Sequence, residues 1–106
     1  MLQAVAAIIT AAILNGVLTV QAGATDAPPR YASGPYLAPL TVRTVPLPKL
    51  QRVCALYGRN QSNGCAILTK KRCTIYLRTG MDPGWRDGVL RHEQAHCRGW
   101  PASHPL

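Results

Sequence analysis

The sequence predicts an α+β fold, in which a small antiparallel β-meander of about three strands packs with one long helix that carries an HExxH motif. Three observations support this prediction. Short runs of β-branched and aromatic residues alternate with polar turns between residues 52 and 77, helical periodicity begins after Gly80, and six of the nine prolines lie within residues 25–50. A chain of 106 residues holds one domain at most, which excludes enzymes built on a large α/β sheet.

The amino-terminal segment, residues 1–24, has no charged side chain and contains an almost continuous apolar run. The run ends in small residues, Ala22 to Ala24, which predicts an export signal that is cleaved after Ala24. We therefore expect the rest of the chain to be periplasmic or secreted. The alternative is an uncleaved membrane anchor, and this segment is the part of the chain for which we expect any membrane contact.

Residues 25–50 are predicted to form an extended Pro-rich arm or linker, because each proline removes a backbone donor and biases its predecessor toward extended conformations. Alternating residues at 41–45 are compatible with one edge strand, which Pro46 and Pro48 keep short. The compact domain is therefore expected within residues 51–106. A domain of this size usually needs disulfides or a metal in addition to its hydrophobic core.

Three runs in this domain predict the β-meander: RVCALY (52–57), CAIL (65–68) and CTIYL (73–77). A helix follows, with Asp82 as its amino-terminal cap and Pro83 in its first position, and Gly99 predicts its end. Along this helix, residues at spacings of 4, 3, 4 and 3 share one stripe: Trp85, Val89, His92, His96 and Gly99.

The four cysteines, Cys54, Cys65, Cys73 and Cys97, predict two disulfides. An exported domain matures in an oxidising compartment, and each bridge contributes about 2–4 kcal/mol to a marginal core. The sequence leaves three connectivities open; we favour Cys65 with Cys73 across the short hairpin and Cys54 with Cys97. The alternative is a cysteine zinc site, but spacings of 11, 8 and 24 contain no CxxC pair.

The motif HExxH occupies residues 92–96. Two histidines four residues apart on a helix present their imidazoles on the same side, which is the spacing that a tetrahedral Zn²⁺ requires. Glu93 lies beside them, where its carboxylate can act as general base toward zinc-activated water. The alternative is that His92 and His96 are ordinary, partly buried histidines. We favour metal binding because the only glutamate of the chain stands between two of its three histidines.

A catalytic zinc needs a third protein ligand beside the position that stays open to water. His104 is the remaining histidine, and the turn at residues 99–101 would reverse the chain toward the metal. The alternative for His104 is a frayed residue near the end of the chain. Asp82 and Asp87 are the reserve ligands, although Asp87 points to the other helix face and Asp82 serves better as a cap.

The run HEQAHCRGW resembles the zincin metallopeptidases, and it is similar to the metzincin extension HExxHxxG, although the third metzincin histidine would fall at Ala102. Together with GCAILTKKRCTIYL, it also resembles very small exported bacterial proteins that pair a Cys-containing meander with an HExxHCxGW motif. The resemblance implies that the strand at 73–77 is the cleft edge that binds an extended peptide through its backbone. It also implies Tyr76 or Arg78 as the group that steadies the oxyanion.

These observations predict an exported zinc-dependent metallohydrolase, a peptidase by default, with Glu93 as catalytic base and with His92, His96 and His104 as zinc ligands. The expected substrate is a peptide or protein. The net charge of +8 adds an anionic cell-envelope polymer to the candidate partners, and we do not expect nucleic acid.

Two alternatives belong to other functional classes. In the first, the chain is a non-catalytic periplasmic accessory protein of a secretion, conjugation or phage system, and the metal and disulfides only hold the fold. In the second, the basic surface binds a polyanion with an affinity that falls steeply with salt.

Overall fold

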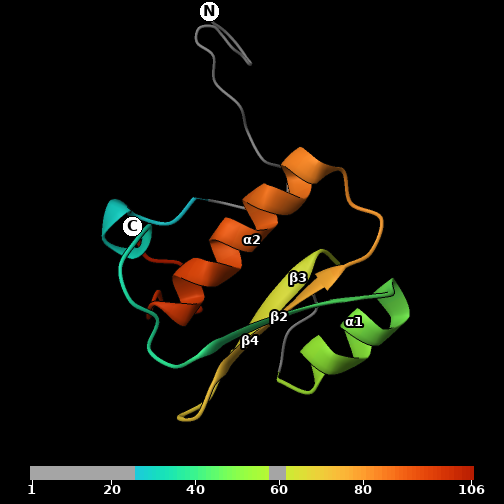
Figure 1. The fold of residues 1–106 in the computed structure, drawn as a ribbon, viewed down its shortest axis with the longest axis horizontal. Coiled ribbons are helices and arrows are strands. Elements are labelled where there is room, and N and C mark those ends of the chain that lie inside the picture. The colour runs from blue at the N-terminus through green and yellow to red at the C-terminus, as the bar shows by residue number, and fades with distance from the viewer. Residues whose placement is uncertain (1–25, 58–61) are drawn as a thin grey trace, which may run out of the picture.

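The structure is a computed structural model that describes residues 26–57 and 62–106 (Figure 1). The predicted export signal, residues 1–24, lies outside these ranges, and no helix within them is long and apolar enough to cross a bilayer. The elements in chain order are a 3₁₀ turn η1 (Pro29–Tyr31), β2 (Leu40–Val45), α1 (Leu47–Ala55), β3 (Gly64–Leu68), β4 (Cys73–Arg78) and α2 (Pro83–Cys97).

The three strands form one mixed sheet between two helices, as Figure 1 shows. Their order is β2-β4-β3, with β3 antiparallel and β2 parallel to the central β4. The α+β class is confirmed, but the prediction of a purely antiparallel meander is wrong. One core lies under α2 and comprises Cys73, Ile75, Leu77, Val89 and Cys97. The other lies under α1 and comprises Val45, Leu50, Cys54 and Cys65.

The run at 52–57, predicted as the first strand, belongs instead to α1 and to the turn that follows it. The helix begins at Leu47 and has Pro48 in its first turn, where proline removes no intrahelical hydrogen bond. Its buried residues, Leu50 and Cys54, stand four apart and therefore share one face. The prolines that end β2 thus also start a helix. This helix start outweighs the strand-like composition of the run at 52–57.

The predicted edge strand exists as β2, and it lies within the residues assigned to the arm. The stretch before it is also packed, because Tyr36 and Leu40 contact the core under α2. Arg98 ties this stretch to the end of α2. Its guanidinium donates to the backbone oxygens of Gly34 (3.0 Å) and Tyr31 (3.3 Å) and to the Tyr36 hydroxyl (3.2 Å). The second half of the arm is therefore part of the fold.

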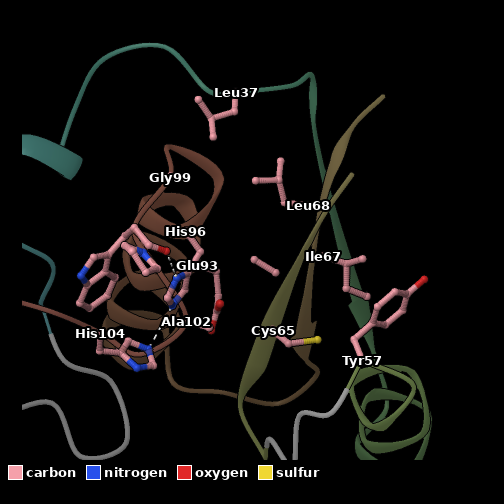
Figure 2. A pocket seen from close by; sticks show the side chains of 13 residues that line it. Leu37, Tyr57, Cys65, Ile67, Leu68, Glu93, His96, Gly99, Ala102 and His104 are labelled. Carbon is pink, nitrogen blue, oxygen red and sulfur yellow. Dashed lines mark hydrogen bonds between the residues drawn. The ribbon is translucent and has the colours of Figure 1, made fainter. Parts of the chain in front are cut away.

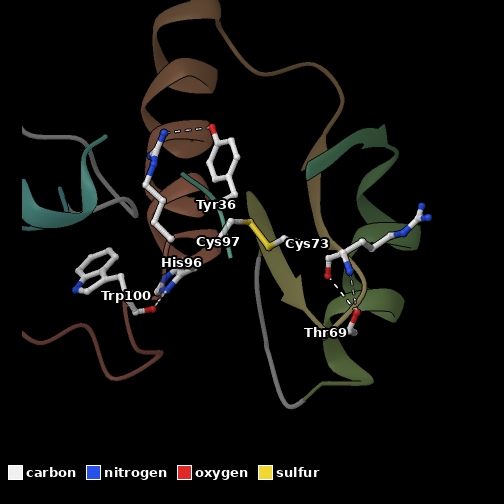
Figure 3. Close-up of a disulfide and its surroundings, with 8 residues drawn as sticks. Tyr36, Thr69, Cys73, His96, Cys97 and Trp100 are labelled. Carbon is white, nitrogen blue, oxygen red and sulfur yellow. Dashed lines mark hydrogen bonds between the residues drawn. A yellow bond between two sulfur atoms is a disulfide. The ribbon is translucent and has the colours of Figure 1, made fainter. Parts of the chain in front are cut away.

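Two disulfides are present, as predicted, but they pair Cys54 with Cys65 and Cys73 with Cys97, the bridge that Figure 3 shows. A Cys65–Cys73 bridge is excluded by the sheet register, because Cys65 is opposite Tyr76, three positions from Cys73, so the two cysteines point to opposite faces. A Cys54–Cys97 bridge would have to cross the sheet. Instead, each disulfide fastens one helix to the sheet face that it covers.

Helix α2 begins and ends where the sequence predicts. The Asp82 carboxylate caps it by accepting from the Trp85 N–H at 3.3 Å. Its end is a Schellman turn: Gly99 has φ +105° and donates to the His96 carbonyl, while the Trp100 N–H donates to the Ala95 carbonyl. This turn sends the chain back along the helix, which decides where the tail lies.

Candidate metal centre

The three histidines converge beside the carboxyl-terminal end of α2. Their Nε2 atoms lie 3.3 Å apart between His92 and His96, 3.1 Å between His92 and His104, and 3.1 Å between His96 and His104. His92 and His96 come from successive turns of α2, and His104 comes from the returning tail. Together these side chains form a cluster that could hold a metal ion.

His104 reaches the cluster through two consecutive turns of the tail. The Schellman turn at Gly99 reverses the chain, and a second turn is closed by the His104 N–H, which donates to the Pro101 carbonyl at 2.9 Å. His104 itself has φ +58°, a left-handed conformation that is uncommon for residues other than glycine. The tail is therefore folded over the helix end, and His104 faces His92 and His96.

Trp100 supports all three imidazoles from one side. Its ring stacks on His96, with centroids 4.9 Å apart and planes at 16°, and meets His92 and His104 edge-on at 5.1 and 4.8 Å. The side chain is 2% exposed, and its Nε1–H donates to the Pro105 carbonyl at 2.8 Å. The signal for this role in the sequence is the position of Trp100 directly after Gly99, the glycine that ends the helix.

The His96 ring is held in the tautomer that a metal ligand needs. Its Nδ1 lies 2.7 Å from the Trp100 carbonyl oxygen (Figure 3). Because a carbonyl oxygen only accepts, Nδ1 carries the proton and Nε2 presents a lone pair to the other two rings. Metal-binding histidines are commonly oriented by such a partner on the second nitrogen, and here the helix-ending turn supplies it.

The spacing of the three nitrogens fits a small tetrahedral ion. Bonds of about 2.0–2.1 Å in tetrahedral geometry require ligand atoms about 3.3–3.4 Å apart. The observed separations of 3.1–3.3 Å are close to this value, so little movement is needed for His92, His96 and His104 to share one ion. Three imidazoles that converge on one point leave a fourth coordination position of such an ion open to another ligand.

Glu93 is the buried acidic residue of the chain, with 6% of its surface exposed. It lines the same cleft as His96 and His104, and Figure 2 shows it on the side of α2 that faces β3. The helical periodicity of the sequence predicts that the histidines lie on the inner stripe, with Glu93 beside it. In the structure, the buried line runs through Val89, Glu93 and Cys97 instead. The carboxylate thus stands between the histidines and the sheet.

A cleft of about 470 Å³ separates the end of α2 and its tail from β3. One wall carries Glu93, His96 and His104, and the other is formed by residues of β3 (Figure 2). Gly64 allows β3 to lie this close to α2, because a Cβ there would stand 2.8 Å from the Tyr76 carbonyl oxygen and 3.1 Å from a Val89 methyl. His96, His104 and Glu93 are therefore accessible from a groove that runs along a strand.

The strand that borders the cleft is β3, not the strand at 73–77 as the resemblance implied. That strand is β4, which lies in the middle of the sheet and is paired on both sides. Tyr76 packs on the α1 side, and Arg78 donates to the Ser62 carbonyl and the Asn63 amide, so neither lines the cleft. Asp82 caps the far end of α2, and neither it nor Asp87 belongs to the histidine cluster.

Comparisons of this chain with protein-family models, with curated proteins and with solved structures give no match. The functional interpretation therefore rests on the geometry of the cluster and the cleft.

The Cys73–Cys97 disulfide fixes the residue next to His96 to the central strand (Figure 3). We expect Cys73→Ala/Cys97→Ala to lower the free energy of unfolding by about 2–4 kcal/mol and also to weaken Zn²⁺ binding. The matched control is Cys54→Ala/Cys65→Ala, which releases α1 on the other face. It should lose similar stability and keep its zinc affinity. Calorimetric zinc titration and thermal unfolding measure the two effects, and equal zinc affinities would contradict this prediction.

Proposed function

We propose that this protein is an exported zinc-dependent metallohydrolase that cleaves peptide bonds. The observation that carries the proposal is the convergence of the Nε2 atoms of His92, His96 and His104 within 3.1–3.3 Å, beside a cleft that also contains Glu93. The two disulfides support an oxidising compartment outside the cytoplasm.

The residues divide the chemistry between them. His92, His96 and His104 would hold the zinc, which when bound lowers the pKa of a water molecule and polarises a carbonyl group. Glu93 accepts a proton on its carboxylate from the attacking water and delivers it to the leaving amine. The Trp100 carbonyl and ring keep His96 oriented throughout, because they hold its Nδ1–H and its plane.

A peptide is the substrate that the cleft favours. Within the described residues, β3 pairs only with β4, so its other edge offers backbone N–H and C=O groups to an extended chain. Among the described residues, the cleft lining contains no lysine or arginine, which does not favour an anionic polymer as the molecule cleaved there. The residues that line the cleft are mostly apolar, and Leu37 and Leu68 lie at one end of it (Figure 2).

Reconstitution of the metal-free protein tests this proposal. After chelation, we expect the chain to bind about one Zn²⁺ and to regain hydrolysis of a mixture of unstructured peptides, whereas Mg²⁺, which prefers oxygen ligands, should restore nothing. Calorimetry measures the stoichiometry, and mass spectrometry measures the cleaved bonds. Failure to bind zinc, or hydrolysis that survives chelation, would refute the proposal.

A further inference from the structure

A second hollow, of about 420 Å³, lies on the α1 side of the sheet. It shares two lining residues, Tyr57 and Ile67, with the catalytic cleft, so the two hollows meet at β3. Its other walls are formed by the end of α1, the β3–β4 hairpin and the face of β4 on the α1 side. The residues are Val53, Leu56, Thr69, Lys71, Arg72, Thr74 and Tyr76.

The two hollows flank the same strand edge from opposite faces of the sheet. Along β3, Ala66 packs toward α2 whereas Cys65 and Ile67 pack toward α1. A peptide strand added to the open edge of β3 would alternate in the same way, because successive side chains of a strand point to opposite faces. Every second side chain of such a peptide would therefore enter the catalytic cleft, and the side chains between them would face the second hollow.

The second hollow is cationic, unlike the cleft. Lys71 and Arg72 are exposed at its hairpin wall, and the chain contains no acidic residue from 27 to 81. Of the residues that the structure describes, those lining the cleft include the Glu93 carboxylate and no lysine or arginine. Next to the two cations, the hollow offers the Thr74 hydroxyl and the apolar surface of Leu56, which is 80% exposed. A carboxylate on a short side chain complements this combination.

We propose that the second hollow is a substrate subsite for an acidic side chain of the peptide that pairs with β3. This inference rests on the proposed function and names its substrate class: an extended peptide with Asp or Glu on the side facing α1. Lys71 and Arg72 attract the carboxylate, and the alternation of the strand fixes which positions can reach them.

A series of peptides that differ in the position of a single aspartate tests this subsite. One Asp is moved through successive positions of an otherwise uncharged peptide, and each peptide is compared with its Asn counterpart. We expect the kcat/KM ratio of Asp to Asn to reach about tenfold at positions spaced by two, and Lys71→Glu/Arg72→Glu should invert it. The matched control, Arg30→Glu/Arg86→Glu, makes the same change in net charge in η1 and α2, on the side of the sheet opposite α1 and outside the lining of the hollow, and should keep the ratio.

Binding of the same peptides to the zinc-loaded Glu93→Gln protein, measured by calorimetry, separates the subsite from the reaction. Binding that depends on Lys71 and Arg72 without any hydrolysis in wild type supports the subsite and refutes the proposed function. Zinc-dependent hydrolysis with equal Asp and Asn peptides overturns the subsite alone. If the peptides are neither bound nor cleaved, both proposals fall.

Discussion

Substitution of Glu93 by glutamine is expected to lower kcat/KM for peptide hydrolysis by about 10²–10⁴-fold, the usual contribution of a general base. The amide has the same shape but cannot accept the proton of the attacking water. Because Glu93 does not belong to the group of candidate metal ligands, the number of zinc ions bound per chain should stay unchanged. Hydrolysis rates and metal content are measured on the same preparation.

The same chemical change elsewhere on α2 provides the control for this variant. Asp87→Asn also converts a carboxylate to an amide, at an exposed position of the same helix. It should retain wild-type hydrolysis and zinc content. If Glu93→Gln hydrolyses peptides as fast as Asp87→Asn does, the general-base role is wrong. If wild type and both variants bind zinc and none hydrolyses any peptide, the accessory-protein alternative gains support.

The His104→Asn variant should weaken zinc binding by more than about 100-fold. Loss of a residue that only hydrogen-bonds to a metal ligand costs at most about 100-fold in metal affinity, and loss of a ligand itself should cost more. Asparagine is the appropriate replacement because it tolerates the left-handed backbone that His104 adopts, with φ +58°. The metal-free variant should therefore unfold at nearly the wild-type temperature, while the stabilisation that added zinc gives to the wild type should disappear.

Thermal unfolding with and without Zn²⁺ measures this effect, together with competition against a chelator of known affinity. Ser103→Ala is the matched control, since it alters the exposed neighbour of His104 in the same tail. Zinc-induced stabilisation of His104→Asn equal to that of Ser103→Ala would show that the tail does not supply a ligand.

The helix that carries the motif could be predicted because its signals are local. A cap at Asp82, a proline in the first turn and a glycine after the last turn each act within a few residues, and all three appear in the structure. The spacing of His92 and His96 follows from helical geometry alone. What the sequence did not show is that the line through Val89 and Glu93 is the one buried against the sheet.

The errors arise where distant segments decide the outcome. The run at 52–57 has strand-like composition, but most of it lies in α1. This helix buries Leu50 and Cys54 against residues of the sheet, and these contacts exist only once the sheet has formed. The disulfide pairing depends on which face of the sheet each cysteine reaches, and Cys65 and Cys73 reach different faces. Sequence spacing contains neither fact.

The candidate site was predictable in its residues but not in its surroundings. His104 could be predicted as the third ligand because it is the one histidine left outside the HExxH motif. The contacts of Trp100 with the histidines depend on the direction in which the tail returns after Gly99. The cleft-forming edge was assigned to the wrong strand because β2 pairs with the far side of β4, and this moves β4 to the centre.

That central position also constrains the order in which the chain can organise itself. Every strand pair of the described sheet includes β4, so no inter-strand ladder can form until residues 73–78 are available. If the chain emerges from a translocation channel with its amino end leading, β2 and β3 stay unpaired until β4 has also emerged. The bridge between Cys54 and Cys65 closes a loop that is complete before then, so oxidation can fasten these two cysteines before the sheet forms.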